Sequence, residues 1–300
     1  MGPGGRVKTV ELTDADLPEY FAALGIPGAV DVHVHFMPDR VMRKVWAYFD
    51  AQAASAGQDW PIAYRFDEAR RLEILRELGV VSFPSLLYPH KPDMAAWLND
   101  WARDFARRTP GCVPTATFFP EPGVAAYTEK ALVEGARIVK AHLQVGGYDP
   151  RDALLDPVWG LLAEARVPVV CHCGDGPQPG AYTGPGPIGE VLARHPDLTL
   201  VIAHCGMPDY AAFLDLAGRY RRVRLDTTMA FTDFAQARSP FPAQRLGQLA
   251  DLGDRIVLGT DFPNIPHPYA HQIAALARLD LGDAWLRAVL HDNGRALVSG

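Results

Sequence analysis

The sequence has few cysteines and no long apolar run. Its four cysteines, Cys112, Cys171, Cys173 and Cys205, are too few for the disulfide framework of a small secreted protein. We therefore expect reduced thiols and a cytoplasmic location. The longest apolar stretches have the length of a strand and fall short of the ~20 residues that a membrane span requires. This excludes a membrane partner from our expectations.

Basic charge is also scarce. The chain carries 29 lysines and arginines against 35 aspartates and glutamates, which gives a net charge of −6. A nucleic-acid surface would need a basic patch, and none is visible. The first ten residues lack the apolar core of a signal peptide. The composition is typical of a protein that binds a small molecule, and it leaves the oligomeric state open, a homo-oligomer included.

Short β-branched runs alternate with helical patterns along all 300 residues, of which 48% are hydrophobic. Strands that alternate with helices imply a parallel sheet, and eight such units indicate a closed (β/α)8 TIM barrel of the α/β class, in one domain spanning 1–300. The eight runs are Ala29–His35, Val80–Leu87, Cys112–Phe119, Arg137–Leu143, Val167–Cys173, Thr199–Cys205, Val223–Thr228 and Arg255–Asp261.

An open, doubly wound sheet is the alternative architecture. Strands buried on both faces of such a sheet read as continuous apolar runs. Here, run after run ends in His, Lys, Asp or Thr. The polar groups would therefore gather at the carboxyl ends of the strands, which form the catalytic face of a barrel.

Two long segments interrupt the alternation. Residues 36–66 follow the first run and include Trp46, Trp60 and Tyr64. Loops of this length are uncommon unless they carry function, so we expect a partly helical cap. The segment from Gly174 to Pro187 follows the fifth run, and its Gly and Pro content predicts a non-helical wall beside the site.

Asp31-Val32-His33-Val34-His35 is the sharpest local motif. Alternate residues of a strand share a face, so the two histidines lie about 6–7 Å apart and can bind one ion. Taken alone, such a pair is as easily incidental.

The pair has partners at other strand ends. His172 ends the fifth run, His204 the sixth and Asp261 the eighth. A lone histidine at a strand end is more often structural, but this set on one rim favours a metal site, because each would otherwise be a desolvated polar group. Cys171 and Cys173 flank His172 on the opposite face, where packing against helices is expected rather than a zinc knuckle.

These motifs resemble the amidohydrolase superfamily, in the amidohydrolase-related (amidohydrolase-2) branch that includes enzymes similar to aminocarboxymuconate-semialdehyde decarboxylase. The resemblance runs from Ala29 to about Leu297 and rests on VDVHVH, VPVVCHCG, LTLVIAHCG, IVLGTDFP and DNGRAL. It implies the barrel and one divalent metal ion, usually zinc. By position, it makes the metal ligands His33, His35, His172 and Asp261, and it makes His204 catalytic rather than ligating.

The implied ligand set leaves one position open for water, as a catalytic metal needs. Such a metal lowers the pKa of water from about 15.7 towards ~7. Asp261 would move the proton, and His204 would polarise a substrate oxygen. The sequence therefore predicts an enzyme that hydrolyses a small organic ester, lactone or amide through metal-bound hydroxide. A non-oxidative decarboxylase of the same branch, a lyase, is the alternative; an inactive binding barrel is disfavoured by the full ligand set.

Three further residues are predicted to bind substrate. Lys140 and His142 share one face of the fourth run, and the lysine suits a substrate carboxylate. Lys140 could instead form a carbamate that bridges two metals, or pair with Asp31. Arg40, with Arg43 and Arg65 of the insertion, suits an anionic substrate, although the default interpretation of these arginines is that they are solvated cap residues.

Overall fold

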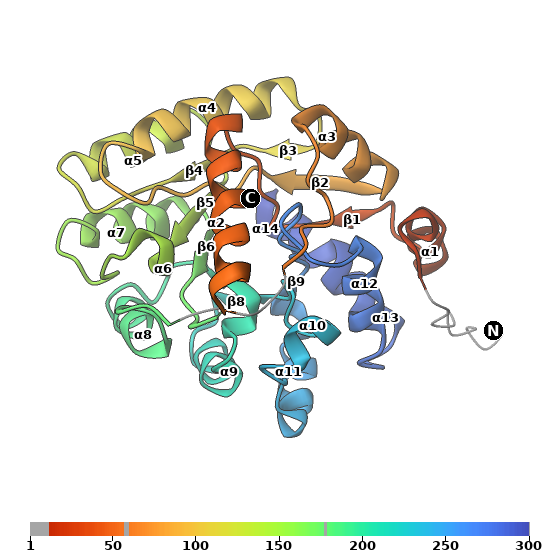
Figure 1. The fold of residues 1–300 in the computed structure, drawn as a ribbon. Coiled ribbons are helices and arrows are strands. Elements are labelled where there is room, and N and C mark those ends of the chain that lie inside the picture. The colour runs from red at the N-terminus through yellow and green to blue at the C-terminus, as the bar shows by residue number, and fades with distance from the viewer. Residues whose placement is uncertain (1–11, 57–59, 177–178, 300) are drawn as a thin grey trace.

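The computed structural model describes residues 12–56, 60–176 and 179–299, and it shows a ring of strands enclosed by helices (Figure 1). Every paired neighbour in the ring is parallel, in the orders β1-β2-β3 and β4-β5-β6-β7-β8-β9. The strands are β1 (Ala29–Val30), β2 (Val80–Pro84), β3 (Cys112–Val113), β4 (Thr115–Thr117), β5 (Ile138–His142), β6 (Val169–His172), β7 (Leu200–Ile202), β8 (Val223–Asp226) and β9 (Ile256–Val257).

The ring closes between the segments that follow β1 and β9. The amide of Val32 donates to the carbonyl of Leu258 at 2.8 Å, and the amide of Asp261 donates to the carbonyl of His33 at 2.9 Å. The amide of His35 completes the seam by donating to Phe262 at 2.7 Å. The predicted (β/α)8 barrel is confirmed, and the open-sheet alternative is wrong.

The third predicted strand is split in two. Pro114 lies between β3 and β4, and proline has no amide hydrogen for the ladder. At this break the amide of Ser85 donates to the side-chain hydroxyl of Thr115 at 3.2 Å. The two short strands therefore occupy one position of the barrel.

The sixth predicted strand is shorter than expected. After β7 the chain turns into a tight segment, η2 (Ala203–Gly206), in which His204 and Cys205 are left-handed, with φ of 56° and 51°. The amide of His204 donates to the Asp226 carboxylate at 2.9 Å instead of to a ladder. His204 therefore lies in the turn after the strand, not on the strand itself.

Helices cover the outside of the barrel. In α4 (Ala95–Arg108), Leu98, Ala102 and Phe105 are buried at helical spacing. None of the helices in the described ranges has both the length and the apolarity to cross a bilayer. The other surrounding helices are α1 (Leu17–Leu24), α3 (Glu68–Glu77), α5 (Val124–Val133), α6 (Leu143–Gly146), α7 (Asp156–Ala165), α8 (Pro185–Arg194), α9 (Tyr210–Arg219), α10 (Asp233–Gln236), α11 (Leu246–Asp251), α12 (Tyr269–Ala277), α13 (Asp283–Arg287) and α14 (Asn293–Val298).

The insertion after β1 contains a long helix, α2 (Asp39–Ala56), which crosses in front of the barrel in orange in Figure 1. Asn264, which follows β9, holds this insertion from two sides. Its side-chain oxygen accepts from the Trp46 indole at 3.0 Å, and its carbonyl accepts from Trp60 at 2.7 Å. Residues 36–66 thus include the expected helix.

The Gly- and Pro-rich segment differs in part from expectation. Helix α8 begins inside it, at Pro185, because proline is tolerated in the first turn of a helix. Residues 177–178 of this segment lie outside the described residues. Asp175, Gly176 and Pro179 line the cavity described next, as a wall would.

Candidate active site

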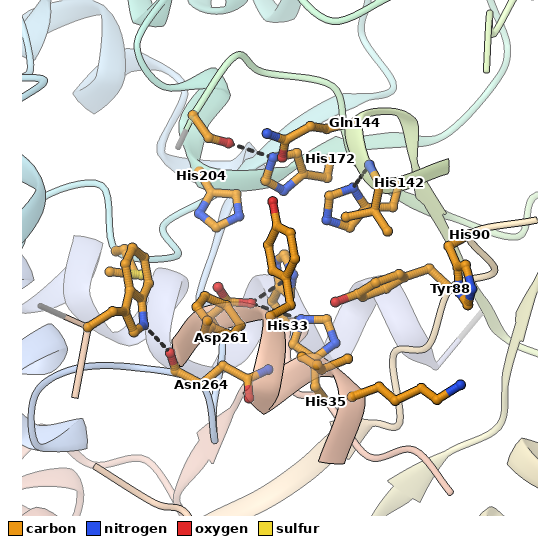
Figure 2. Close-up of a pocket in the computed structure, with 18 of the residues that line it drawn as sticks. His33, His35, Tyr88, His90, His142, Gln144, His172, His204, Asp261 and Asn264 are labelled. Carbon is orange, nitrogen blue, oxygen red and sulfur yellow. Dashed lines mark hydrogen bonds and ion pairs between the residues drawn. The ribbon is translucent and has the colours of Figure 1, made fainter. Parts of the chain in front are cut away.

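Five of the residues singled out in the sequence meet in one place. His33 and His35 follow β1, His172 ends β6, His204 lies in η2, and Asp261 follows β9. All five line a cavity of about 1520 Å³ at the carboxyl ends of the strands (Figure 2). Ring centroids lie 5.1 Å apart for His33 and His35, and 4.8 Å apart for His172 and His204. The barrel has brought together side chains from far apart in the sequence.

Hydrogen bonds on the far side of three rings fix their protonation. Nδ1 of His33 donates to Asp226 at 2.9 Å, and Nδ1 of His35 donates to the carbonyl of Leu86 at 2.8 Å. Nε2 of His172 donates to the carbonyl of Gly176 at 2.7 Å. Carbonyl and carboxylate oxygens only accept here, so in each neutral ring the other nitrogen is unprotonated and carries a lone pair, which in His33 accepts from Lys140. This is how metal-binding histidines are usually oriented.

The Nε2 atoms of His33 and His35 face a carboxylate. Nε2 of His35 lies 2.8 Å from an oxygen of Asp261, and Nε2 of His33 lies 3.5 Å from the same oxygen. Three acceptors around one point repel one another unless a positive charge joins them, and the Lys140 ammonium, 2.9 Å from Nε2 of His33, supplies such a charge on the His33 side only. A second proton on His35 or a divalent cation would satisfy this arrangement, and the nitrogen and oxygen donors suit a metal ion of the zinc type.

The pKa shifts follow the same arrangement. Burial, and then the nearby Lys140 ammonium, lower the pKa of His33 to about 4, so the ring is neutral at pH 7. Burial alone would raise the pKa of Asp261, but its hydrogen bond with His35 and the surrounding imidazoles hold that pKa well below its usual range. The site therefore presents the neutral His33 imidazole beside an ionised Asp261 carboxylate.

The potential metal group found among the described residues is not the set that the resemblance implies. Within the described ranges, the ligand atoms of His33, His204 and Asp261 all lie within 4.8 Å of one another. Nδ1 of His204 is buried and has no hydrogen-bond partner there. His172 stacks instead against His142, with ring centroids 4.1 Å apart. The geometry leaves His204 near enough to bind a metal ion or to act on a substrate beside it.

Lys140 lies beneath the site. Its side chain is fully buried, is not among those that line the cavity, and donates from Nζ to Nε2 of His33 at 2.9 Å. Burial lowers the pKa of this ammonium. Asp31 is not its partner, because that carboxyl accepts from Thr260 at 2.5 Å and from Tyr269 at 3.0 Å. A metal ion on Nε2 of His33 would compete with Lys140 for the same lone pair.

Asp226 is a site residue that the sequence analysis missed. At the end of β8 it accepts from Nδ1 of His33, from the amide of His204, and from the amide of Thr228 at 3.1 Å. Burial would raise its pKa, but the His33 ring prevails and holds the pKa below the usual range. Gly259 makes room for this cluster, since a Cβ there would lie 2.8 Å from Cβ of His33 and 3.0 Å from Cγ of Asp226. The only sequence signal was a polar residue at a strand end.

Tyr88 was also missed. Its ring packs on His142 at 4.6 Å and on His35 at 5.7 Å between centroids, and Figure 2 shows it beside the histidine cluster. Burial and the nearby Asp261 raise the pKa of this phenol, so it remains a hydrogen-bond donor at neutral pH. It lies one residue beyond the second predicted run.

The remaining predicted residues divide between the cavity and the surface. His142 lines the cavity, and its Nδ1 accepts from the amide of Val145 at 3.3 Å, so Nε2 carries the ring proton. Arg40 also lines the cavity, from α2. Arg43 does not, and Arg65 pairs with Asp50 at 2.7 Å. Of the three insertion arginines, Arg40 alone is placed to meet a ligand in this cavity.

Comparisons with known proteins place this fold among described barrels. The sequence model of the amidohydrolase family matches residues 30–299. No curated protein matches the sequence. A solved TIM-barrel protein from Bordetella bronchiseptica is 20% identical, with a TM-score of 0.68 over 91% of this chain and 98% of that one.

Two further solved structures cover 91% of this chain at 14% identity. One is a 5-carboxyvanillate decarboxylase from Sphingomonas paucimobilis, with a TM-score of 0.63 over 99% of its length. The other is a probable 2-pyrone-4,6-dicarboxylic acid hydrolase from Acinetobacter baumannii, with a TM-score of 0.61 over its whole length. At this identity the likeness extends to the fold alone.

Proposed function

Because the chain belongs to the amidohydrolase family, we propose that it is a metal-dependent hydrolase of a small organic ester, lactone or amide. We propose His33, His35, His172 and Asp261 as the residues that hold one divalent ion, with zinc as the expected metal. The observation that supports this best is the close approach of Nε2 of His35 to the Asp261 carboxylate at 2.8 Å, with Nε2 of His33 3.5 Å from the same oxygen. No hydrogen bond between neutral rings and a carboxylate explains that contact.

A divalent ion in such a site polarises a substrate carbonyl and lowers the pKa of a water molecule. The protein's own groups would move the proton. Asp261 is ionised and faces the cavity, so it can accept a proton from the attacking water and return it to the leaving group. His204, neutral because burial lowers its pKa, presents an unpartnered Nδ1, and the Tyr88 phenol adds a donor for a substrate oxygen.

Metal analysis of the purified protein tests whether the chain binds one divalent ion. About one divalent ion per chain is expected. Two tightly held ions, together with a carbamate on Lys140, would replace the mononuclear assignment by a binuclear one. A panel of aryl esters, lactones and amides then tests hydrolysis.

A decarboxylase is the second candidate, and the lining of the cavity favours it. Tyr88, Trp97, Phe49 and Trp60 offer aromatic surfaces beside the histidine cluster, which suits an aromatic acid. One structural neighbour is a 5-carboxyvanillate decarboxylase. Carbon dioxide release from a panel of aromatic carboxylic acids, measured beside the hydrolysis assays, separates the two activities. Release of carbon dioxide without any hydrolysis would overturn the hydrolase proposal.

A further inference from the structure

The cavity is much larger than the histidine cluster needs, and α2 forms its far wall. Residues 40, 44 and 48 of this helix, and residues 41, 45 and 49, recur at intervals of four and line the cavity. They therefore share one face of the helix. Arg40 and Lys44 occupy its amino-terminal part, and Tyr48 lies about 12 Å further along the axis than Arg40 and about 6 Å further than Lys44. This wall changes from cationic to aromatic along its length.

The cationic end is joined by the loop after β2. Lys91 and His90 of that loop line the same cavity. Burial lowers the pKa of His90, and the positive charges of Lys91 and Lys44 lower it further, which places these side chains near one another. We call Arg40, Lys44 and Lys91 the basic rim.

Within the part of the chain that the structure describes, no acidic side chain forms an ion pair with the basic rim. No carboxylate of the described residues lies within 4.0 Å of Arg40, Lys44 or Lys91. The Arg40 guanidinium rests over the Trp97 ring at 4.7 Å, a contact that orients it and uses none of its N–H donors. Two further aspartates line the cavity. The carboxylate of Asp175 accepts a hydrogen bond from Thr183, and Asp93 forms no ion pair with the basic rim.

The basic rim is positively charged, whereas the chain as a whole carries a net charge of −6. A solvated cap needs no such cluster on its inner face. Arginine and lysine beside an aromatic wall suit an organic anion, because the guanidinium can bind a carboxylate through two hydrogen bonds. A positive rim also attracts such a ligand from solution.

We infer that the cavity takes an elongated organic acid that bears an anionic group away from its reacting end. The anionic group binds the basic rim, the apolar body lies along Tyr48, Phe49 and Trp60 of the insertion, and the reacting group meets the histidine cluster. This inference rests on the proposed metal-dependent function, and it adds the substrate class and the residues that select it.

Two pairs of hydroxamic acids test the inference on the metal-loaded, full-length protein. A hydroxamate anchors one end of the probe at the metal, which fixes its direction in the cavity. The probes are 4-phenylbenzohydroxamic acid and its 4′-carboxy derivative, with benzohydroxamic acid and its 4-carboxy derivative as a shorter pair. Calorimetric titration gives the affinity gained from the carboxylate in each pair.

The carboxylate of at least one pair should tighten binding to the wild type by about 10-fold, as expected for a charge-assisted hydrogen bond. Arg40→Gln and Lys44→Gln should each remove most of that gain and leave the uncarboxylated probe unaffected. Arg43→Gln is the matched control, because it removes one charge from an exposed residue of α2 that does not line the cavity. It should keep the gain.

Three outcomes would overturn the inference: no gain in either pair, a gain that survives both cavity substitutions, or an equal loss in Arg43→Gln. Failure of the uncarboxylated hydroxamates to bind would instead count against the metal site. In that case biphenyl-4-carboxylate alone tests the rim. Its affinity should fall in Arg40→Gln, and an unchanged affinity would again overturn the inference.

Discussion

Asp226 holds two groups of the site at once, the imidazole of His33 and the backbone of His204. Substitution by Asn keeps the size of the side chain but removes the charge that fixes the proton on Nδ1 of His33. We expect Asp226→Asn to weaken metal binding by about 10–100-fold, as is usual when the hydrogen-bond partner of a metal ligand is lost. Competition with a chelator of known affinity measures this change.

Asp31→Asn is the control for loss of a buried carboxyl nearby. Asp31 is fully buried and accepts from the amide of His33, but it does not contact the imidazole. It should leave metal affinity close to that of the wild type. Equal losses in both variants would mean that Asp226 supports only the packing.

His172 and His204 can be separated by their effects on metal content. His172→Ala should lower both metal occupancy and activity, because His172 is proposed as a ligand. His204→Ala should keep the metal and lower turnover by about 10²–10⁴-fold, the range for a lost acid–base or polarising group. The unpartnered Nδ1 of His204 and its place within 4.8 Å of His33 and Asp261 make this a demanding test.

Elemental analysis of the two purified variants gives the answer. If His204→Ala loses the metal as readily as His172→Ala, then His204 is a ligand and the proposed division of roles is wrong. Loss of folding in both variants, without a selective effect on the metal, would point to structural histidines.

At the scale of single residues, the sequence could identify those site residues that belong to a local motif or stand at the end of a predicted strand. His33 and His35 form a pair within one strand, and His172 and Asp261 stand at predicted strand ends. Asp226 could not be identified, because its function depends on a ring 193 residues away in sequence. Tyr88 depends likewise on His35 and His142, which only the closed barrel places beside it.

At the scale of elements, Asn264 joins the insertion to the segment that carries Asp261. Asn264→Ala removes the acceptor of the Trp46 indole and should loosen α2. We expect faster hydrogen exchange and faster proteolysis in residues 39–56, together with weaker ligand binding, while the barrel keeps its exchange rates.

Asn99→Ala is the matched control, since Asn99 is a buried asparagine of α4 that clasps Thr117 by hydrogen bonds of 3.0 and 2.8 Å. It should destabilise the protein without releasing α2. Unchanged exchange in α2 of the Asn264 variant would show that other contacts hold the helix.

The loop before α12 carries a pH-sensitive histidine. Nδ1 of His267 donates to the carbonyl of Pro268, and Nε2 is buried with no hydrogen-bond partner among the described residues. Burial, with a smaller effect of His271, lowers the pKa to about 4 despite nearby Asp14 and Asp233. In the unfolded chain His267 therefore becomes protonated near pH 6.5, whereas in the folded protein it becomes protonated only near pH 4.

Between pH 6.5 and pH 4 the unfolded state binds this proton more readily than the folded state. The free energy of unfolding is therefore highest above pH 6.5 and falls as the pH decreases towards 4. Between pH 7.5 and pH 5 the loss should be about 2 kcal/mol of unfolding free energy. Denaturant unfolding at both pH values should show a smaller loss for His267→Gln than for the wild type. His195→Gln controls for removal of a histidine elsewhere, and an identical pH dependence in all three proteins would refute the assignment.

Two predicted strands end earlier than their apolar patterns indicate. In each case a backbone amide is not available for hydrogen bonding between the strands, because the residue is proline or because a side chain accepts from the amide. Pro114 divides the third strand, and Asp226 captures the amide of His204 and ends the sixth strand early. Apolar periodicity shows which segment is a strand, but it does not show where the ladder stops. The helix in residues 36–66 was expected, whereas the start of α8 at Pro185 was not.

At the scale of the whole molecule, the proposed ligands join separate positions of the barrel. They come from segments at the ends of β1, β6 and β9, so a bound metal would link the first and last strands to the middle of the ring. A ligand that binds only the folded state adds about 4 kcal/mol of stability at 1,000 times its dissociation constant.

Removal of the metal by a chelator should therefore lower Tm, and zinc should restore it. In His172→Ala the same additions should have a much smaller effect. Calorimetry of the wild type and this variant measures both shifts. Equal Tm values of the wild type with chelator and with zinc would argue against a metal shared between these strands.

The seam that closes the barrel has a consequence for how the protein is made. His35 and Asp261 lie 226 residues apart in sequence, and they meet only where the first and last strands pair. During synthesis, His33 and His35 leave the ribosome long before Asp261, the carboxylate beside which they lie in the folded barrel. The metal site that we propose therefore cannot be complete before residue 261 has left the ribosome.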